Sequence, residues 1–270
     1  MDTPASIFEE VEEDLKFIAT SAVRAKMLMN LLEKPKTSTI LKDELGVGAS
    51  TVIHAARDLE KHGYLVEKAD GYHLTTIGKI TTYKLIELIK TLRTLRKSQE
   101  FWLTHAVEGV PEKFLREMYK LWNHEILRAS VRNVFKTLSV YLELSKKAKK
   151  FWGVSPIFVS AFVTLVKKLA ARNAEVKLVL TKEVFEEVKK SHKDVLQEVM
   201  PKIEIWIIEE EPKVAFTVTD SFLSLGLFGE DGVYDPTYDI ISREKEAIEW
   251  GRELFEYYKS RARKVTMEDL

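Results

Sequence analysis

The stretch between residues 49 and 75 constrains the fold most, because a single glycine joins a helical pattern to two short alternating segments. Helical spacing predicts a helix from about Ala49 to His62, with an inner stripe of Val52, Ala55, Ala56 and Leu59. Gly63 is placed to end this helix, since glycine readily adopts the left-handed conformation at a helix C-terminus. Residues 64–68 and 72–74 alternate like strands about Asp70-Gly71, a pair typical of hairpin turns. The sequence therefore predicts a helix that a β-ribbon flanks directly.

Three further helical patterns precede this unit. Ser6 and Glu9 have the spacing of a capping box, which predicts a first helix with one apolar face of Ile7, Val11, Leu15 and Ile18. A second helix is predicted at about 21–33 and a third at 37–45, the latter capped by Thr37. Glycines at 46 and 48 then allow the sharp turn that leads into the helix at 49–62.

Three short helices followed by a two-stranded hairpin is the order of elements in a winged helix-turn-helix. A helix fits the major groove of duplex DNA, which is ~12 Å wide, when other helices hold it clear of the domain body. We expect the helix at 49–62 to enter the groove and the wing at 64–74 to lie on the backbone. The candidate DNA-binding residues are Thr37, Ser38, Gly48, Ala49, Ser50, Thr51, His54, Arg57 and Lys61, with Lys68, Tyr72 and His73 on the wing.

Charge is distributed unevenly, although 42 basic and 42 acidic residues give a net charge of zero. Residues 16–97 carry 15 Lys and Arg against 8 Asp and Glu, whereas residues 2–14 carry six acids and no base. A positive segment of domain size favours a polyanionic partner for that segment. A solvated lysine-rich surface, or a face that docks another protein, explains the same charges; the order of elements favours double-stranded DNA.

A long helical pattern follows the hairpin, from Thr76 to about Ala106. Its apolar stripe consists of Ile77, Ile80, Leu85, Leu88, Ile89, Leu92 and Leu95. The stripe either packs back on its own domain or pairs with its twin in a second subunit; we favour a homodimer, because the stripe is longer than one small domain can cover. Whether the helix at 77–95 or the C-terminal domain makes the dimer stays open. The predicted domains are a winged helix-turn-helix at 1–78, a linking or dimerisation helix at 79–108 and a regulatory domain at 109–270.

Beyond Gly109-Val110-Pro111, strand-like and helical patterns alternate. Strands are predicted at 125–129, 151–158, 175–180 and 202–208 and in two further runs joined at Asp220-Ser221. Ser130, Thr181 and Ser242 are placed to cap helices. This alternation indicates an α/β domain with a mixed, partly parallel sheet covered on both faces, so we expect a multi-domain, α plus α/β protein.

The composition narrows the function classes. With 270 residues, of which 45% are apolar, the chain can form two cores. It contains no cysteine, which excludes disulfides, thiolate metal sites and a thiol nucleophile. No stretch approaches the ~18 uninterrupted apolar residues of a membrane span and no apolar signal region follows the acidic start, so we expect a cytoplasmic protein without a membrane partner. Lys and Glu are abundant, and the sequence has two glutamines, Gln99 and Gln197. This composition resembles that of thermophile proteins.

Four stretches carry a resemblance to the archaeal methanogenesis-regulatory-protein family. They are GVSPIF (153–158), EVKLVLTKEVFEEV (175–188), FTVTDSFLSLGLFGEDGVYDPTYD (216–239) and EWGRELFEYYKSRA (249–262). The resemblance covers essentially the whole chain and implies an archaeal transcription regulator that joins a winged helix to a C-terminal α/β domain. It further implies that the C-terminal domain is a degenerate relative of phospholipase-D-like folds that senses a signal.

The phospholipase-D relation raises an enzyme hypothesis. That chemistry needs a histidine nucleophile with lysine two residues later, and this spacing occurs at none of His54, His62, His73, His105, His124 and His192. The sequence also lacks a glycine-rich phosphate loop, a paired-histidine metal site and a nucleophile elbow. We therefore expect no catalytic residues, no metal and no cofactor, and keep a phosphodiesterase-like enzyme and a protein-interaction adaptor as alternative functions.

Polar residues near strand ends are candidates for an effector site, because open α/β sheets bind ligands there. The candidate ligand-binding residues are Trp152, Ser155, Thr181, Thr217, Thr219, Ser224 and Tyr234, with Asp220 and Asp235 beside them. Several have a structural explanation as well, since threonine can cap a helix, aspartate can form a turn and tryptophan can belong to the core. We expect a DNA-binding regulator whose C-terminal domain senses a small-molecule effector of unknown identity or supports dimerisation.

Overall fold

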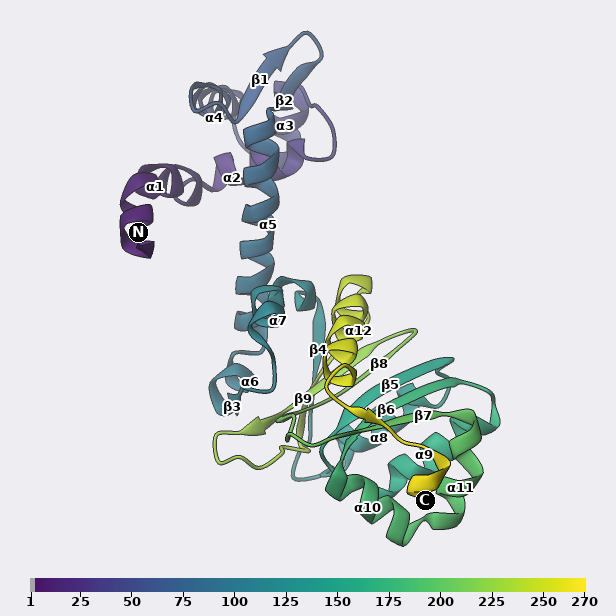
Figure 1. The fold of residues 1–270 in the computed structure, drawn as a ribbon. Helices are drawn as coiled ribbons and strands as arrows, with labels where there is room; N and C mark the ends of the chain where they lie inside the picture. The colour runs from purple at the N-terminus through teal and green to yellow at the C-terminus, as the bar shows by residue number, and fades with distance from the viewer. Residues whose placement is uncertain (1–2) are drawn as a thin grey trace. The chain divides into compact units, whose positions relative to one another are not determined.

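The boundary between the two parts of this chain falls within one helix, α5 (Thr76–Lys97). The computed structural model describes residues 3–270 and divides into unit 1, Met1–Ile89, and unit 2, Lys90–Leu270 (Figure 1). The division lies inside the predicted linking segment 79–108 and not at its ends. Residues 1 and 2 of the predicted first domain lie outside the described part. Each unit is described by itself.

Unit 1 has the predicted order of helices and hairpin before α5 (Figure 1). Its elements are α1 (Pro4–Ala19), α2 (Ala22–Leu31), α3 (Ser38–Leu45), α4 (Ala49–Lys61), β1 (Leu65–Lys68) and β2 (Gly71–Leu74). The predicted capping box of Ser6 and Glu9 is wrong by one turn. Thr3 is the N-cap and its hydroxyl accepts a hydrogen bond from the Ser6 N–H at 3.2 Å. Pro4 fits the first turn, where a helix needs no N–H donor.

The core of unit 1 is formed by α2, α3, α4 and the hairpin. The predicted inner stripe of α4 is buried in full, at Val52, Ala55, Ala56 and Leu59. It packs with Met27 and Leu28 of α2, Leu41 of α3 and Leu65 of β1. Gly46 ends α3 in the left-handed conformation, with φ 64°, so the turn into α4 uses the residue that adopts this backbone at least cost.

Backbone contacts fix the hairpin to the rest of unit 1. Lys36 and Tyr72 exchange two backbone hydrogen bonds, of 3.4 and 2.9 Å. A Cβ on Gly71 would lie 2.6 Å from the Lys36 carbonyl oxygen, so only glycine fits at this position. The strand register pairs Lys68 with Gly71, which places the turn at residues 69–70, one residue earlier than predicted.

α5 ends sooner than the helix predicted to reach Ala106. Ser98 has a non-helical backbone, with φ −123° and ψ 39°, and is followed by the short helix α6 (Gln99–Thr104) and strand β3 (His105–Ala106). The break accompanies the burial of Phe101, whose ring centroid lies 5.1 Å from that of Tyr238. Phe101 and Tyr238 are 137 positions apart in the sequence, so the spacing of apolar residues could not predict this contact or the end of the helix.

Unit 2 is built on a mixed sheet in the order β11-β7-β6-β5-β8-β9-β10-β4, with β3 paired to β9. The remaining strands are β4 (His124–Arg128), β5 (Lys150–Ser155), β6 (Glu175–Thr181), β7 (Glu204–Ile208), β8 (Val214–Thr219), β9 (Leu223–Gly229), β10 (Tyr238–Ser242) and β11 (Arg263–Lys264). β5, β6 and β7 are parallel and the other pairs are antiparallel. The predicted partly parallel sheet is therefore confirmed.

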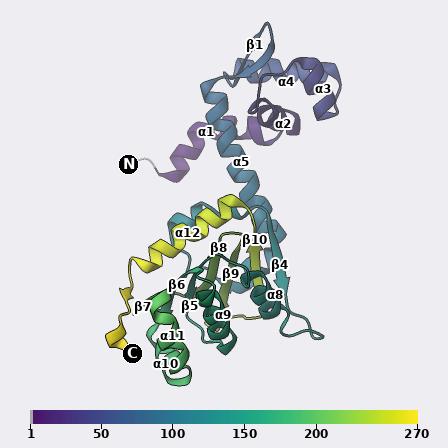
Figure 2. The same cartoon turned by 90° about the vertical axis from the view of Figure 1, so that its right-hand side faces the viewer.

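Helices cover both faces of this sheet, with α12 on one face and α8 to α11 on the other (Figure 2). The helices of unit 2 after α6 are α7 (Glu112–Arg116), α8 (Lys136–Ser145), α9 (Ser160–Ala171), α10 (Lys182–Ser191), α11 (Lys193–Val199) and α12 (Lys245–Lys259), with 3₁₀ turns η1 (Met118–Leu121), η2 (Met200–Lys202) and η3 (Met267–Asp269). Thr181 caps α10 as predicted, since its hydroxyl accepts from the Val184 N–H at 3.3 Å.

Two predicted caps in unit 2 are wrong, and three strands escape prediction, the two-residue strands β3 and β11 and the longer β10. α8 begins at Lys136, so Ser130 lies in the loop before it. Ser242 is the last residue of β10, where its hydroxyl donates to the Asn123 carbonyl at 2.8 Å, and Glu244 precedes α12. β10 is short and follows a turn at Asp235-Pro236; its pairing with β4 and β9 makes it a strand.

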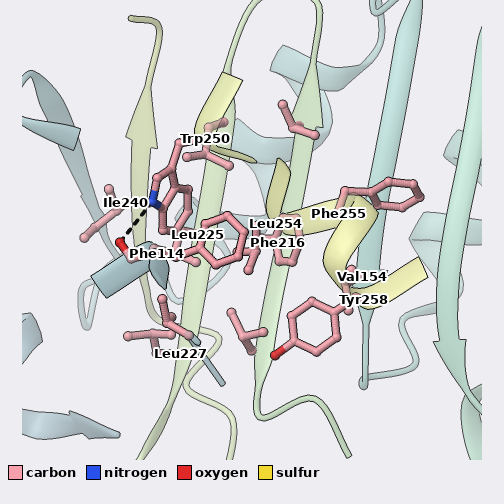
Figure 3. Close-up of a cluster of buried hydrophobic side chains, with 14 of the residues drawn as sticks. Phe114, Val154, Phe216, Leu225, Leu227, Ile240, Trp250, Leu254, Phe255 and Tyr258 are labelled. Atoms are coloured by element: carbon pink, nitrogen blue, oxygen red, sulfur yellow. Dashed lines mark hydrogen bonds between the residues drawn. The ribbon is translucent and has the colours of Figure 1, made fainter. Parts of the chain in front are cut away.

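The core beneath α12 orients this helix on the sheet (Figure 3). Trp250 is fully buried and its indole N–H donates to the Phe114 carbonyl at 3.1 Å, which ties α12 to α7. Leu254 lies beside Phe216 in this cluster, and the Phe255 ring packs against Trp152 and Trp206, with ring centroids 5.4 and 6.3 Å away. Large apolar side chains fill the face of the sheet that α12 covers. On the face that α8 and α9 cover, part of the sheet carries small side chains instead.

Candidate nucleic-acid interface

The N-terminus of α4 is open to solvent. Gly48 is the N-cap and provides no side-chain acceptor for the first N–H groups of the helix. Gly48, Ala49, Ser50 and Thr51 are all exposed. Free N–H groups at a helix N-terminus attract phosphate, so this end of α4 is suited to the backbone contact predicted for these positions.

Polar side chains follow the outer face of α4 at spacings of four, three and four residues: Ser50, His54, Arg57 and Lys61. All four are exposed, on the side opposite the buried stripe. Within residues 3–270, the side chains of His54, Arg57 and Lys61 form no hydrogen bond or ion pair. A cation without a protein partner keeps its donors available for phosphate, and arginine can also bind guanine in the major groove.

The acids next to these cations already have partners elsewhere. Asp58 lies 3.6 Å from Arg24 of α2, and Glu60 accepts a hydrogen bond from the Glu67 backbone N–H at 3.2 Å. The sequence -Arg57-Asp58-Leu59-Glu60-Lys61- has little net charge. In the folded unit, Asp58 and Glu60 are directed to other groups, which leaves the cations as the free charges of this helix.

Thr37 and Ser38 stand at the start of α3. Thr37 is exposed and caps this helix, because its hydroxyl accepts from the Ile40 N–H at 3.4 Å. Ser38 is half-buried. Thr37 therefore has a structural role whether or not it also contacts DNA. The neighbouring Lys36 is buried and pairs with Glu44 at 2.6 Å, so its charge is not available to a partner.

The three wing candidates differ in accessibility. Lys68 is exposed beside the hairpin turn and, among the described residues, has no ion-pair partner. His73 is half-buried and its Nε2 lies 2.7 Å from an Asp70 carboxylate oxygen, a hydrogen bond that holds the pKa of Asp70 below its usual range. Tyr72 is only 6% exposed and belongs to the core of unit 1. Tyr72 therefore has to be removed from the predicted contact surface, because strand alternation turns its ring inward.

The candidate ligand-binding residues of unit 2 separate into two groups. Ser155, Thr217, Ser224 and Tyr234 line one cavity of about 190 Å³. Trp152, Thr181 and Thr219 do not line it. Trp152 packs beside Phe255 under α12, Thr181 caps α10, and Thr219 accepts hydrogen bonds from the turn at 221–222. Asp220 likewise binds the backbone N–H groups of residues 149 and 150.

Two polar residues of this cavity that contact predicted ones escaped prediction, Tyr141 and Asp239. The Tyr141 hydroxyl lies 2.8 Å from the Thr217 hydroxyl, and the Ser224 hydroxyl donates to Asp239 Oδ2. Burial raises the pKa of Asp239 to about 7, although the hydrogen bond from Ser224 and the nearby backbone N–H groups of Ile240 and Leu225 favour the charged form and oppose the rise. An acid inside an apolar strand pattern, as in Tyr238-Asp239-Ile240-Ile241, is the signal that could have identified it.

The histidines do not assemble into a catalytic group in the described part of the chain. His105 comes closest, because its Nε2 lies 3.2 Å from Asp235 and its Nδ1 lies 3.0 Å from the Thr104 hydroxyl. Its Nδ1 also lies 2.9 Å from the Phe101 carbonyl, and the Thr104 hydroxyl donates to the Glu100 carbonyl at 2.8 Å. A nitrogen that donates to a carbonyl cannot take a proton from threonine. Residues 3–270 also contain no cluster of three or more His, Cys, Asp or Glu able to hold a metal.

Of the helices in the described residues, none combines the length and the apolar character needed to cross a bilayer.

Two family models match this chain. The model of the N-terminal domain of the methanogenesis regulatory protein FilR1 matches residues 12–93, and the model of its middle domain matches residues 134–261. The methanogenesis regulatory protein FilR1 of Methanothrix harundinacea (strain 6Ac) is 29% identical over 262 residues, which are 95% of this chain and 59% of that protein. The chain thus spans about three fifths of the length of this curated relative.

Similar solved structures are more distant. One is the structure of TrmBL2, which is described as an archaeal chromatin protein with a novel mode of DNA binding. It is 17% identical to this chain, with a TM-score of 0.43, and the match covers 97% of this chain and 100% of the TrmBL2 chain. A putative O-methyltransferase from Nostoc punctiforme PCC 73102 has 15% identity and a TM-score of 0.26, over 76% of this chain and 65% of its own. Scores this low establish neither a common fold nor a common function.

Proposed function

We propose that this chain is a transcription regulator of the FilR1 methanogenesis regulatory protein family and that it binds double-stranded DNA through unit 1. Two matched domain models and a curated relative support the family assignment. The observation that carries the proposal is the outer face of α4, where exposed cations without protein partners follow an uncapped helix N-terminus. α4 enters the major groove, and Lys68 of the wing contacts the backbone.

A salt titration tests the DNA proposal. Neutralised phosphates release counterions, so the logarithm of the affinity falls with the logarithm of salt, with a slope of about −0.9 per phosphate contact. We expect Arg57→Ala and Lys61→Ala each to weaken binding to promoter DNA and to reduce this slope by about one, as fluorescence anisotropy measures. Neither change should lower the melting temperature, because both side chains are exposed.

Lys182→Ala is the matched control, since it removes an exposed lysine of α10 in unit 2. It should leave affinity and slope unchanged. Equal affinities of the wild type and the Arg57 and Lys61 variants would contradict the proposed role of α4. A flat response of the wild type to salt would contradict DNA binding altogether.

We further propose that the regulator is a homodimer joined through α5. Five apolar residues of one helix face are 41–61% exposed: Ile77, Ile80, Leu88, Leu92 and Leu95. Leu88, Leu92 and Leu95 have the four-and-three spacing of a coiled-coil seam. A helix that leaves such a stripe in water is best explained by a second copy that covers it, and a two-fold dimer would read two half-sites.

The sensing role belongs to unit 2 in this proposal, where four of the seven predicted ligand residues line one cavity. A degenerate phospholipase-D-like origin of this unit is compatible with the missing histidine-lysine spacing. The phosphodiesterase alternative finds no support in the histidines described above. The adaptor alternative differs in its partner, and sedimentation of the protein with and without duplex DNA separates the two, since an adaptor would not shift with DNA.

A further inference from the structure

The cavity of unit 2 exists because small residues meet on three adjacent strands. Gly153 of β5 is paired with Thr217 of β8, which is paired with Ser224 of β9. In the next row, Ala215 of β8 is paired with Gly226 of β9. Side chains of this size do not fill the space between the sheet and the helices α8 and α9 that cover this face, and a volume of about 190 Å³ stays open. Close packing is the rule in protein interiors, so a void of this size calls for an occupant.

One end of the cavity is polar and incompletely satisfied. Asp239, which is 5% exposed, lines the cavity and accepts a hydrogen bond from Ser224 on Oδ2. In the described structure, its other oxygen, Oδ1, is buried without a hydrogen-bond partner. A buried acceptor without a donor is unfavourable, so Oδ1 marks the place where a ligand donor would be stabilised. Tyr141, Thr217 and Tyr234, which carry hydroxyl groups, line the same cavity.

The rest of the lining is apolar and carries no positive charge. Phe151 and Leu178 from the sheet and Phe162, Val166 and Val184 from the helices are typical members. Of the described residues that line the cavity, none is lysine, arginine or histidine. An anionic ligand would therefore lose its hydration without gaining a counter-charge, and Asp239 would repel it when ionised. The lining excludes phosphates and carboxylates and favours a neutral or cationic donor.

The volume limits the size of the occupant. An engineered apolar cavity of about 150 Å³ holds benzene. A cavity of about 190 Å³ therefore accommodates on the order of ten non-hydrogen atoms.

We propose that the cavity of unit 2 binds a small, mainly apolar molecule whose single hydroxyl or amine donates a hydrogen bond to Asp239 Oδ1. This inference deepens the sensing role proposed above and rests on it for its biological meaning. The binding itself is independent of DNA.

Four probes with one common body test the proposal by isothermal titration calorimetry on the full chain without DNA, at pH 8, where the Asp239 carboxyl is ionised and its Oδ1 acts as an acceptor. 4-Methylphenol presents a hydroxyl, 4-methylbenzylamine an amine, 4-methylanisole the same ring without a donor, and 4-methylbenzoate an anion. We expect the phenol or the amine to bind with a Kd of about 1 mM or tighter, and the stronger of the two identifies the donor. The anisole and the benzoate should bind at least about tenfold more weakly, the size of one lost hydrogen bond to a buried group.

Cavity-filling variants locate the site. Ala215→Leu fills the cavity from the sheet and Val163→Phe from α9, so both should abolish binding of the preferred probe. Ala171→Leu, an exposed position on α9, is the matched control and should bind as the wild type does. Circular dichroism melts verify that each variant is folded, and two independent fillers keep the test valid if one of them is not.

The proposal is overturned by any of three results. These are absence of binding by both donor probes, equal or tighter binding of the anisole or the benzoate, and wild-type affinity in a folded filling variant. This experiment contains no DNA, so its result does not depend on whether unit 1 binds DNA. Conversely, a negative result here would not contradict the DNA binding that the salt titration of the α4 variants tests.

Discussion

Gly78 shows how a single residue fixes the start of α5. A Cβ at this position would lie 1.8 Å from the Tyr64 carbonyl oxygen, and that oxygen accepts the Thr75 N–H at 3.1 Å. The Thr75 hydroxyl donates to the Gly63 carbonyl at 2.6 Å and accepts from the Gly78 N–H at 3.0 Å. The end of α4, the first wing strand and α5 therefore meet at a point where glycine alone leaves enough room.

Gly78→Ala should consequently destabilise unit 1. Alanine is favoured over glycine inside a helix by about 1 kcal/mol, but a clash with backbone cannot be relieved by rotating a side chain and costs typically about 1–3 kcal/mol or more. We expect the second effect to prevail and the free energy of unfolding to fall by about 2 kcal/mol in denaturant titrations. Lys79→Ala, an exposed change on the same turn, should stay within about 0.5 kcal/mol of the wild type. A Gly78 variant as stable as this control would contradict the close approach.

Asp239 makes stability depend on pH, with a sign set by its raised pKa. Burial raises this pKa from 3.8 to about 7, so between about pH 4 and 7 the folded state binds more protons than the unfolded state. The free energy of unfolding therefore falls as pH rises through this window and levels off above it. The neighbouring Tyr141 and Tyr234 have pKa values raised by burial and stay neutral throughout.

Asp239→Asn should remove this dependence, because an amide does not ionise. A shift of about three pKa units corresponds to about 4 kcal/mol over the whole window. About two of these units fall between pH 5 and pH 8, so the stability of the variant relative to the wild type should increase by up to about 3 kcal/mol over this interval. Chemical denaturation at the two pH values measures the difference, with the exposed Glu230→Gln as control. Parallel pH profiles of the wild type and the Asp239 variant would be incompatible with a buried, protonated carboxyl.

α5 exposes an apolar stripe that no other part of the described chain covers. Leu92 is 57% exposed, although it continues the stripe on which half-buried Leu85 contacts the core of unit 1. α1 shows the same feature, with Ile7, Phe8 and Leu15 each about half exposed. Amphipathic helices normally bury their apolar faces, so both helices favour association with another chain.

Leu92→Glu should therefore disrupt the proposed dimer without unfolding the monomer. A charge at an apolar seam position is strongly unfavourable when it is covered and nearly neutral when it is exposed. We expect sedimentation velocity to show a dimer for the wild type and a monomer for the variant at the same concentration. Arg96→Glu, a charge change on the same helix, should remain dimeric. If the wild type sediments as a monomer at micromolar concentration, the dimer proposal is wrong.

At the scale of the whole molecule, the proposed dimerisation and the proposed DNA binding would be coupled through the number of phosphates contacted. Two copies of unit 1 on one duplex neutralise about twice as many phosphates as one copy, and the salt slope scales with that number. Leu92→Glu should thus approximately halve the slope of log affinity against log salt on DNA, although Leu92 is not one of the proposed DNA-binding residues. An unchanged slope in a monomeric variant would show that one copy carries the whole contact.

Much of unit 1 could be predicted from sequence because its signals are local. The buried stripe at 52–59, the glycine that ends α3 and the cap at Thr37 each depend on residues within about four positions. The predicted capping box of Ser6 and Glu9 was wrong because Thr3 and Pro4, which are also local signals, start the helix one turn earlier. Tyr72 was misplaced because a four-residue strand does not reveal which of its two faces is covered.

The order of elements, the mixed sheet, the family resemblance and the cationic outer face of α4 were determined by the sequence alone, since periodicity and turn residues act over short stretches of chain. Only the tertiary structure decided which polar residues share a site. Tyr141 and Thr217 are 76 positions apart and Ser224 and Asp239 are 15 apart, yet their side chains meet in one cavity. Strand pairing makes such contacts, and whether a buried carboxyl finds a donor depends on every element packed around it.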